Sequence, residues 1–270
     1  MGETLKTVQE LIDESPVVDI TEMYEQWRGA LAGLLAKVES RFELTQDPST
    51  NGMEVESELG DGIHGKIACF AGPEIDWLVY SWVADPKRGF ANLHLTISPG
   101  AQVDIPLFGM AFANFGIRPW AYIDVLPRRN IAVDTAYYEK YYASGNEHWL
   151  DVRRSNPRMD WFTSPSAYVR GIISPIPFLY SGPYEQATTD LMISEAHTML
   201  DRWLGWWDTD ASVPEAERDE FGRFTEDLRR TAAQMDPANS VAERLFGSET
   251  SDLLVARIWG EGRTLPYAGR

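Results

Sequence analysis

The residue with the clearest chemical potential is a histidine in the stretch NLHLTISPGAQVDIPLFGMAFANFG, residues 92–116. Alternation of side chains along a β-strand places His94 on one face with Asn92 and Thr96, and three aliphatic residues on the other. An imidazole titrates near neutral pH, so His94 could exchange a proton with a ligand or bind a metal. The neighbouring segments are apolar on both faces, which is typical of a sheet covered on both sides. We therefore expect His94 to face either solvent or a pocket.

Signatures of self-contained catalysis are missing from the rest of the sequence. It has no glycine-rich dinucleotide or phosphate loop, no G-x-S-x-G and no H-E-x-x-H. The single cysteine, Cys69, excludes an intramolecular disulfide, a four-cysteine zinc site and a protein-held iron–sulfur cluster. The histidines lie far apart in sequence and none has a second histidine at i+3 or i+4, namely His64, His94, His148 and His197. We predict neither a nucleotide site nor a metal cluster.

The elements that must position His94 fall into three blocks. Residues 1–38 have helical spacing, 39–126 read as strands, and 134–259 read as helices. The predicted N-terminal helices cover 3–13 and 20–37. The predicted strands are SRFELT, GKIACF, IDWLVYSWV, FANLHLTI, LFGMAFANF and WAYIDVL. Because the gaps between them are too short for parallel crossovers, we expect antiparallel pairing. The order predicts a single α+β domain over 1–270, with helices layered on an antiparallel sheet.

Composition narrows the possible partners and location. The 270 residues are 44% hydrophobic, enough to bury a core, and carry a net charge of −17, which argues against nucleic acid as a partner. No apolar run approaches the roughly 20 residues that a membrane-spanning helix needs. The acidic N-terminal segment lacks the apolar stretch of a signal peptide. We predict a cytoplasmic protein without a membrane span.

Aromatic residues are abundant, with ten Trp and eleven Tyr. Several fall on the predicted sheet, namely Trp77, Tyr80, Trp82, Trp120 and Tyr122. A bulky core accounts for them, and so does a flat cavity that holds a conjugated ligand. Composition alone leaves both interpretations open.

Three segments carry a family resemblance. They are VDIPLFGMAFANFG continued by AYIDVLPRR, then SPSAYVRGIISP at 164–175, and MDPANSVAERLFGSETSDLL at 235–254. In this order, between about residues 64 and 259, they resemble the ferredoxin-dependent bilin reductases and, more closely in places, their relatives the red chlorophyll catabolite reductases. The resemblance implies an α/β/α sandwich with a central antiparallel sheet. It also implies a linear tetrapyrrole bound between the sheet and the C-terminal helices.

The same resemblance implies a reaction and its residues. Ferredoxin would supply single electrons, the protein would supply protons, and no redox cofactor would be tightly bound. His94 matches a sheet histidine of the family that bonds and protonates the substrate, a role suited to imidazole. Asp236 matches a C-terminal aspartate that donates a proton when an apolar pocket raises its pKa. Asp236 followed by proline is also a good helix N-cap, and both interpretations stand.

Further residues are expected at the substrate. Arg170, and also Arg128 and Arg129, could grip propionate carboxylates through a planar guanidinium fork, although each could equally form a surface ion pair. The resemblance places Trp82, Asn92 and Ala111 in the substrate site as well.

Two departures from the family pattern affect the expected mechanism. The bilin reductases carry Asp, and the chlorophyll catabolite enzymes Glu, where this sequence has Ala111. A methyl group cannot donate a proton, so Asp236, His94 or water would have to substitute. A second family glutamate falls near Trp82 and is also missing.

Three functional hypotheses follow. The first is a ferredoxin-dependent reductase of a bilin or chlorophyll catabolite. Because ferredoxins are acidic, it needs a local basic patch, for which the candidates are Lys87, Arg88, Arg128, Arg129, Arg153 and Arg154. The second is a haem-binding oxidase or oxygenase on the same fold, with His94 as axial ligand. The third is a tetrapyrrole carrier without catalysis.

Overall fold

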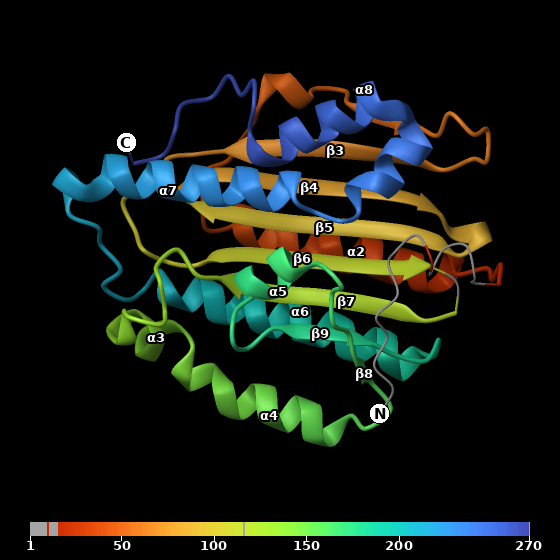
Figure 1. The fold of residues 1–270 in the computed structure, drawn as a ribbon, viewed down its shortest axis with the longest axis horizontal. Coiled ribbons are helices and arrows are strands. Elements are labelled where there is room, and N and C mark those ends of the chain that lie inside the picture. Colours follow the sequence, from red (N-terminus) through yellow and green to blue (C-terminus); the bar gives the residue numbers. More distant parts are fainter. Residues whose placement is uncertain (1–9, 11–15, 116, 270) are drawn as a thin grey trace.

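The structure is a computed structural model that describes residue 10 and residues 16–115 and 117–269. Its centre is an antiparallel β-sheet with helices packed on both sides (Figure 1). The chain is thus a three-layer α/β/α sandwich of the α+β class, as predicted. None of the helices within the described ranges is long and apolar enough to cross a membrane.

The described strands form one sheet in which every pair is antiparallel. Their order is β1-β3-β4-β5-β6-β7-β9-β8, and β2 pairs with β3 outside this path. The strands are β1 (Thr45–Gln46), β2 (Glu54–Glu56), β3 (His64–Ala71), β4 (Ile75–Asp85), β5 (Phe90–Pro99), β6 (Leu107–Phe115), β7 (Pro119–Leu126), β8 (Asp160–Trp161) and β9 (Phe178–Ser181). Short connections place β3 to β7 side by side in sequence order.

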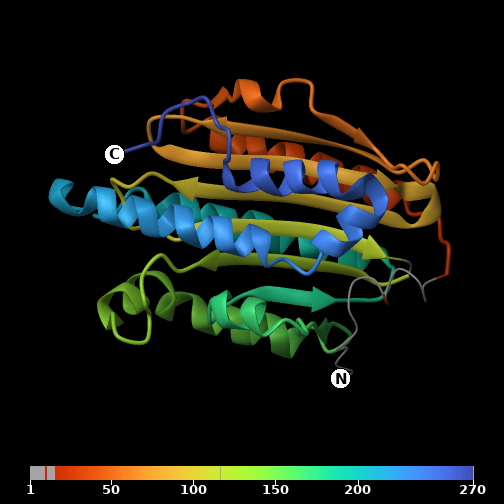
Figure 2. The same ribbon diagram turned by 45° about the horizontal axis from the view of Figure 1, so that its top comes forward.

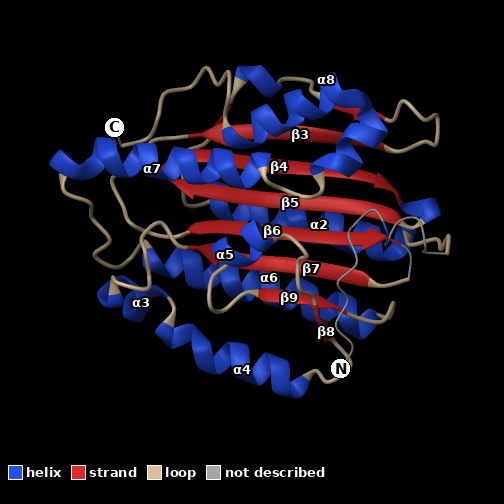
Figure 3. Cartoon of the chain, in the orientation of Figure 1, coloured by secondary structure: helices blue, strands red, loops and turns tan. Residues whose placement is uncertain are grey.

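The helices divide between the two faces of the sheet (Figure 3). Behind it lie α2 (Thr21–Glu39) and α6 (Gln186–Trp206), and in front lie α5 (Ala167–Ile172), α7 (Glu215–Gln234) and α8 (Asn239–Trp259). Two further helices, α3 (Thr135–Tyr141) and α4 (Asn146–Ser155), run beside the β9–β8 edge. Short 3-10 turns are η1 (Pro48–Thr50), η2 (Pro86–Arg88) and η3 (Ala143–Gly145). We call the side under α2 and α6 the back face and the other side the front face.

The back face is the main hydrophobic core. Alternate residues of β4 to β7 point there and pack against the apolar stripe of α2, whose members Trp27, Leu31 and Leu34 are fully buried. Trp27 stacks on Phe112 of β6 with ring centroids 5.4 Å apart. Because each such side chain contributes about 1.5–3 kcal/mol on burial, this face supplies much of the folding free energy.

The front helices are tied to the sheet by buried polar contacts. Asp76 of β4 accepts hydrogen bonds from Arg229 of α7 (2.9 Å) and from Arg263 of the C-terminal segment (3.1 Å). Although burial works against ionisation, the two guanidinium groups hold the pKa of Asp76 below its ordinary value. Trp77 Nε1 donates to the Arg257 carbonyl of α8 at 3.0 Å. These contacts hold α7 and α8 against the front of the sheet, and Figure 2 shows both helices (blue) on that side.

Helix α8 bends at Gly247, whose φ of 73° lies in the left-handed region that favours glycine. A side-chain carbon there would meet the Glu58 carboxylate at 2.9 Å. The backbone of Glu58 also donates to the Leu245 carbonyl at 2.8 Å. The bend therefore lets the loop between β2 and β3 dock against the helix.

The element boundaries differ from expectation at the sheet edges. The helix predicted over 20–37 is α2, whereas the one predicted over 3–13 lies, except for residue 10, outside the described residues. The predicted strand SRFELT (40–45) is mostly turn and loop, and only its last residue, Thr45, belongs to a strand, β1. The sequence pattern missed β2, β8 and β9, because two- to four-residue strands are too short to show alternation.

Candidate functional site

The polar residues of β5 point to the front face, as alternation predicted. His94 pairs in register with Ala111 of β6, which pairs with Tyr122 of β7, so the three share one row. Asn92 and Thr96 flank His94 on the same face. In contrast to the back face, the polar members of this group are only partly buried. Solvent therefore reaches the row under the front helices.

His94 is held in a defined orientation by its neighbour on the strand. Its Nε2 lies 2.7 Å from Asn92 Oδ1, so Nε2–H can donate to the amide oxygen and the neutral ring keeps Nδ1 as an acceptor. Burial lowers the pKa of His94, and the nearby carboxylate of Asp236 partly raises it again. His94 is thus a mostly neutral imidazole whose protonation depends on a second residue. Across the described residues, no group of three His, Cys, Asp or Glu side chains could hold a metal ion.

Asp236 lies in the connection between α7 and α8 and is exposed. Its Oδ1 accepts the backbone N–H of Ala238 at 2.8 Å, which shapes the turn before α8. The N-cap position itself belongs to Ala238. The prediction that Asp236 is a helix N-cap is therefore wrong, because α8 begins at Asn239 and the Asp236 side chain bonds within the preceding turn. The charge of Asp236 also acts on His94 and Tyr122, so the turn lies within electrostatic reach of the row.

A buried acid that the sequence analysis did not single out lies on β7, two residues after Tyr122 and on the same face. Asp124 is fully buried and faces the front, opposite Gly109. It accepts hydrogen bonds from Ser174 N–H (3.0 Å), Ser174 Oγ, Val125 N–H (2.8 Å) and Tyr122 OH (3.3 Å). Burial raises the pKa of Asp124 in spite of these bonds, which favour the ionised form. The signal in the sequence was an acid inside WAYIDVL, a strand otherwise apolar around it.

A cavity of about 240 Å³ adjoins the row on the β9 side. Leu179 of β9, which lines it, pairs in register with Tyr122. Phe162, another lining residue, stacks on Trp120 of β7 with centroids 5.8 Å apart. The volume falls below the 300–1,000 Å³ usual for small-molecule sites, so this cavity could take one end of a long ligand.

Arg170 of α5 also lines this cavity and is exposed. Its Nη1 donates to the carbonyl oxygens of Ser164 at 2.7 Å and Pro165 at 3.0 Å, and its other nitrogens have no hydrogen-bond partner within the described ranges. Arg170 therefore has guanidinium nitrogens at the cavity that could bind an anionic group, and its predicted role in substrate binding stays a prediction.

Arg128 and Arg129 do not share this location. Arg128 is fully buried and donates to Thr225 Oγ1 of α7 and to the backbone carbonyls of the β5–β6 connection, at Gly100, Val103 and Ile105. These bonds use the guanidinium to brace α7 against the sheet, so the prediction that Arg128 grips a substrate is wrong. Arg129 pairs with Asp104 at 3.7 Å, at the end of β7 away from the β4–β5 turn.

Trp82 likewise lies away from His94. It pairs with Leu93 and points to the back face, where Tyr24 packs against it edge-on and Arg28 covers its ring at 4.3 Å. Its assignment to the substrate site next to His94 is therefore wrong, because alternation sends it to the opposite side of the sheet. Of the five aromatic residues that the sequence places on the sheet, Trp77, Trp120 and Tyr122 share the front face with His94.

The six basic residues proposed as one patch are dispersed. Lys87 and Arg88 are exposed in the β4–β5 turn, and Arg153 and Arg154 are exposed near the end of α4. Arg128 and Arg129 follow β7 at the opposite end of the sheet, and Arg128 is buried. Any basic surface must therefore be smaller than the predicted one.

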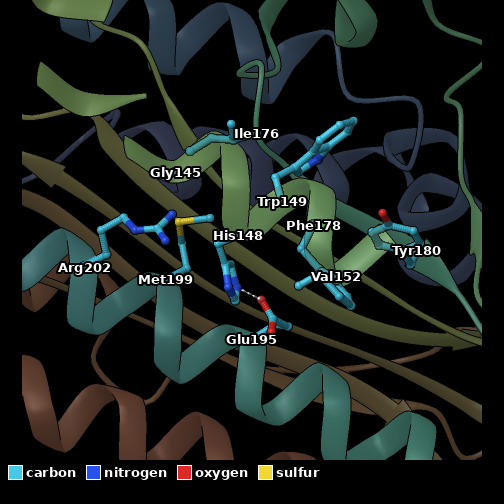
Figure 4. Close-up of a pocket in the computed structure, with 10 residues that line it drawn as sticks. All are labelled: Gly145, His148, Trp149, Val152, Ile176, Phe178, Tyr180, Glu195, Met199 and Arg202. Atoms are coloured by element: carbon cyan, nitrogen blue, oxygen red, sulfur yellow. Dashed lines mark hydrogen bonds and ion pairs between the residues drawn. The ribbon is translucent and has the colours of Figure 1, made fainter. Parts of the chain in front are cut away.

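A second pocket lies between α4, α6 and β9, away from His94 (Figure 4). Inside it His148 Nε2 contacts Glu195 Oε2 at 2.8 Å, and Arg202 and Met199 line the wall. The enclosed space is about 10 Å³, room for no more than a water molecule. The contact between His148 and Glu195 therefore links α4 to α6, and the pocket around it has no room for an organic ligand.

Comparison with known proteins identifies the family of the chain. The family model described as red chlorophyll catabolite reductase matches residues 28–260. The red chlorophyll catabolite reductase of Hordeum vulgare is 26% identical over 184 residues, which cover 64% of this chain and 89% of that protein. Red chlorophyll catabolite reductase 1, chloroplastic, of Oryza sativa subsp. japonica is 25% identical over 203 residues, 69% of this chain and 60% of that protein.

A solved structure extends the comparison to the fold. Phytochromobilin synthase from tomato, in complex with biliverdin, superposes with a TM-score of 0.77 at 16% identity, over 86% of this chain and 82% of that one. At this identity the likeness shows the same fold. Because the family model spans nearly the whole sheet and all front helices, the chain belongs to the red chlorophyll catabolite reductase family.

Proposed function

We propose that the protein reduces an open-chain tetrapyrrole, a bilin or a chlorophyll catabolite, at the front face around His94. The observation that carries the proposal is the partly exposed imidazole on β5, whose pKa is lowered by burial and partly raised again by the carboxylate of Asp236 in the α7–α8 connection. Together they border the same space from opposite sides, the sheet and the helical layer. A conjugated pigment between them could receive protons from either.

Proton delivery would be divided between the two groups. His94 is mostly neutral without ligand, since burial lowers its pKa. A carbonyl or lactam group of the pigment placed against it could accept its proton once His94 is charged, and the Asp236 carboxylate favours that charged form. The nearby Asn92 amide would keep the ring orientation fixed during the transfer.

The pigment would extend from this row into the cavity under α5. The relatives are named as reductases of a chlorophyll catabolite, and the tomato protein of the same fold was solved with biliverdin. A pigment longer than the 240 Å³ cavity would cover the exposed row as well. Its carboxylate side chain could then reach the free nitrogens of Arg170.

Electrons would come from a reduced ferredoxin, one at a time. The net charge of −17 opposes an acidic partner, so docking needs a local positive surface. Lys87 and Arg88, exposed at the turn that joins β4 to the His94 strand, are the candidates that the structure leaves accessible at that end of the sheet.

The test is anaerobic reduction of bound biliverdin, and separately of red chlorophyll catabolite, by reduced ferredoxin. Bleaching of the long-wavelength pigment band is expected with at least one of them. His94→Gln and Asp236→Asn should each slow bleaching about 10²- to 10⁴-fold, the usual contribution of general acid catalysis. His197→Gln, a partly buried histidine on back helix α6, is the matched control and should react as the unaltered protein does.

Two outcomes would contradict the proposal. One is the absence of bleaching with both pigments although they bind, which would favour a carrier. The other is bleaching that is unaffected by His94→Gln and Asp236→Asn, which would place the proton donors elsewhere.

A second candidate function is supported by the contact between His94 and Asn92. Histidines that bind metals usually donate their other ring N–H to a carbonyl or carboxylate, as Nε2–H does here to Asn92 Oδ1. Nδ1 could then bind the iron of a closed haem, and the chemistry would be oxidative. A Soret band that survives gel filtration after addition of haem, and disappears in His94→Ala, would favour this function. Retention of an unchanged band in His94→Ala would exclude His94 as ligand.

A further inference from the structure

The row that contains His94 presents a second ionisable side chain. Ala111 lies between His94 on β5 and Tyr122 on β7, paired in register with both. Side chains paired across antiparallel strands are about 5 Å apart at Cβ, so both rings border the space over the Ala111 methyl group. Both residues are partly exposed, and the charge of Asp236 acts on both.

The ring of Tyr122 is fitted over a glycine of the neighbouring strand. A side-chain carbon on Gly109 would lie 3.4 Å from Tyr122 Cε1 and 4.0 Å from its hydroxyl oxygen. In this position the hydroxyl is 3.3 Å from Asp124 Oδ2. The phenol ring thus lies against Gly109 while its hydroxyl reaches a buried carboxyl group.

The partners of Asp124 differ in what they can do when it is protonated. The backbone N–H groups of Val125 and Ser174 can only donate, whereas the hydroxyls of Ser174 and Tyr122 can donate or accept. An ionised Asp124 accepts from all of them. A protonated Asp124 can instead donate to the Tyr122 oxygen, which turns the phenol O–H toward the open face.

We propose that Tyr122 is a proton donor to the tetrapyrrole, and that Asp124 behind it returns the proton, at the point where Ala111 supplies no acid. The inference rests on the proposed reductase function. Reducing one double bond of the pigment consumes two electrons from the ferredoxin and two protons. In the step assigned here, the Tyr122 O–H bond breaks and a new bond to hydrogen forms on the pigment. The phenolate then takes the proton of the Asp124 carboxyl group, and solvent restores that proton through Tyr122.

The pKa directions of Tyr122 and Asp124 agree with Tyr122 as the proton donor and Asp124 as the group behind it. Burial and the charge of Asp124 raise the pKa of Tyr122 well above its ordinary value, so the phenol remains a donor at neutral pH. Burial also raises the pKa of Asp124, against the hydrogen bonds that lower it, and so favours the protonated carboxyl group that this step needs. The other ionisable groups on the front side near the pair are His94 on β5 and Asp236 before α8, whereas Tyr142, after α3, belongs to the hydrophobic core of the back face.

The test compares Tyr122→Phe with a matched control in the reaction with biliverdin or red chlorophyll catabolite, whichever the unaltered protein reduces. Tyr122→Phe should bind the pigment unchanged and reduce it about 100-fold or more slowly, since it keeps the ring and loses the proton. The control, Tyr142→Phe, removes a buried hydroxyl that donates to the Val125 carbonyl of the same strand at 3.0 Å. It should reduce the pigment at the unaltered rate.

Rescue and pH dependence separate proton delivery from a structural role. Ala111→Asp in the Tyr122→Phe protein puts a carboxyl group beside the lost phenol and should recover about tenfold or more of the rate. Asp124→Asn should change the pH profile of reduction and leave pigment binding unchanged. If Asp124→Asn does not fold, Ser174→Ala, which removes one hydrogen bond to the ionised carboxylate, should shift the same profile toward higher pH.

The outcomes distinguish this inference from the proposed function. If the unaltered protein reduces a pigment, and Tyr122→Phe does so equally fast while His94→Gln is slow, the function stands and the role of Tyr122 is wrong. If the unaltered protein reduces neither pigment, the proposed function fails and this inference fails with it. Should Tyr122→Phe not fold, fluorotyrosine at position 122 keeps the hydroxyl and lowers its pKa. A pH profile unmoved by that replacement would overturn the inference.

Discussion

The two faces of the sheet are made from alternate residues of the same strands, yet helices seal them to different degrees. On the back face Leu93, Leu95 and Phe112 are fully buried under α2 and α6. On the front face their sequence neighbours Asn92 and His94 remain partly exposed. Because side chains alternate along a strand, one side of β5 contributes buried apolar residues to the core, and the other side carries polar groups that solvent can reach.

This difference also explains how the front face can hold ionisable groups without losing the fold. Buried hydrogen bonds attach α7 to the sheet from Arg229 to Asp76 and from Arg128 to Thr225. These bonds lie away from the row of His94, Ala111 and Tyr122. Ala111, where the resemblance led us to expect an acid, lies on this front face and not in the back-face core. Stability and chemistry should thus respond to different substitutions.

The largest expected effect is on the back face. Phe112→Ala removes a fully buried ring that stacks on Trp27, and should lower the free energy of unfolding by about 3–5 kcal/mol. Thr96→Ala, on the front side of the adjacent strand, should cost no more than about 0.5 kcal/mol. Urea unfolding of both variants measures the contrast. Equal losses would mean that the two faces do not differ in sealing.

The next effect concerns the attachment of the front helices. Asp76→Asn leaves the buried guanidinium groups of Arg229 and Arg263 without their carboxylate and should cost about 3 kcal/mol. The exposed pair of Lys37 and Asp201 offers a control, since Asp201→Asn should cost no more than about 1 kcal/mol. Thermal unfolding distinguishes them, and a similar small loss in both would refute the anchoring role of Asp76.

A smaller effect is expected in acid. Asp47 is buried, and although burial works against it, hydrogen bonds from Leu265, Ser49 and Thr264 lower its pKa from 3.8 to about 2. Because the folded pKa is depressed, its contribution of about 2 kcal/mol is present above the unfolded value and lost as the pH falls from 3.8 toward 2. Asp47→Asn should flatten that part of the stability curve. An unchanged acid slope would contradict this.

The smallest effect is a shift in the titration of His94. The Asp236 carboxylate raises the pKa of His94, so Asp236→Asn should move the midpoint to lower pH with no measurable loss of stability. Nuclear magnetic resonance of the imidazole protons follows this directly, and Asp201→Asn is the control for an exposed carboxylate away from the row. A midpoint that stays in place or rises would show that Asp236 does not face His94.

Much of the fold could be predicted because alternation acts locally. The pattern from Asn92 to Ile97 fixed which side chains share a face, and the short turns fixed the antiparallel neighbours. Local patterns carry no such information about Arg128, whose burial depends on carbonyl groups and a threonine distant in sequence. Trp82 was assigned to the wrong side because the family pattern was carried over without applying the alternation that placed His94.

Only those parts of the candidate site that lie on one strand could be predicted from the sequence. His94 and Asn92 follow from one strand, whereas the pairing of Tyr122 with Asp124 matters only once β6 and β7 are in register and Ser174 is folded over them. An acid within an apolar strand was the available signal. That Asp124 is buried and accepts several hydrogen bonds could be seen only in the tertiary structure.

The most direct test of the difference between the faces is a crystal structure of the protein with biliverdin bound. We predict pigment against His94 and Tyr122 on the front face, with one end in the cavity beside Arg170. Pigment on the back side, near Trp82 or in the pocket of His148 and Glu195, would contradict the central claim that the partly open front face is the functional one.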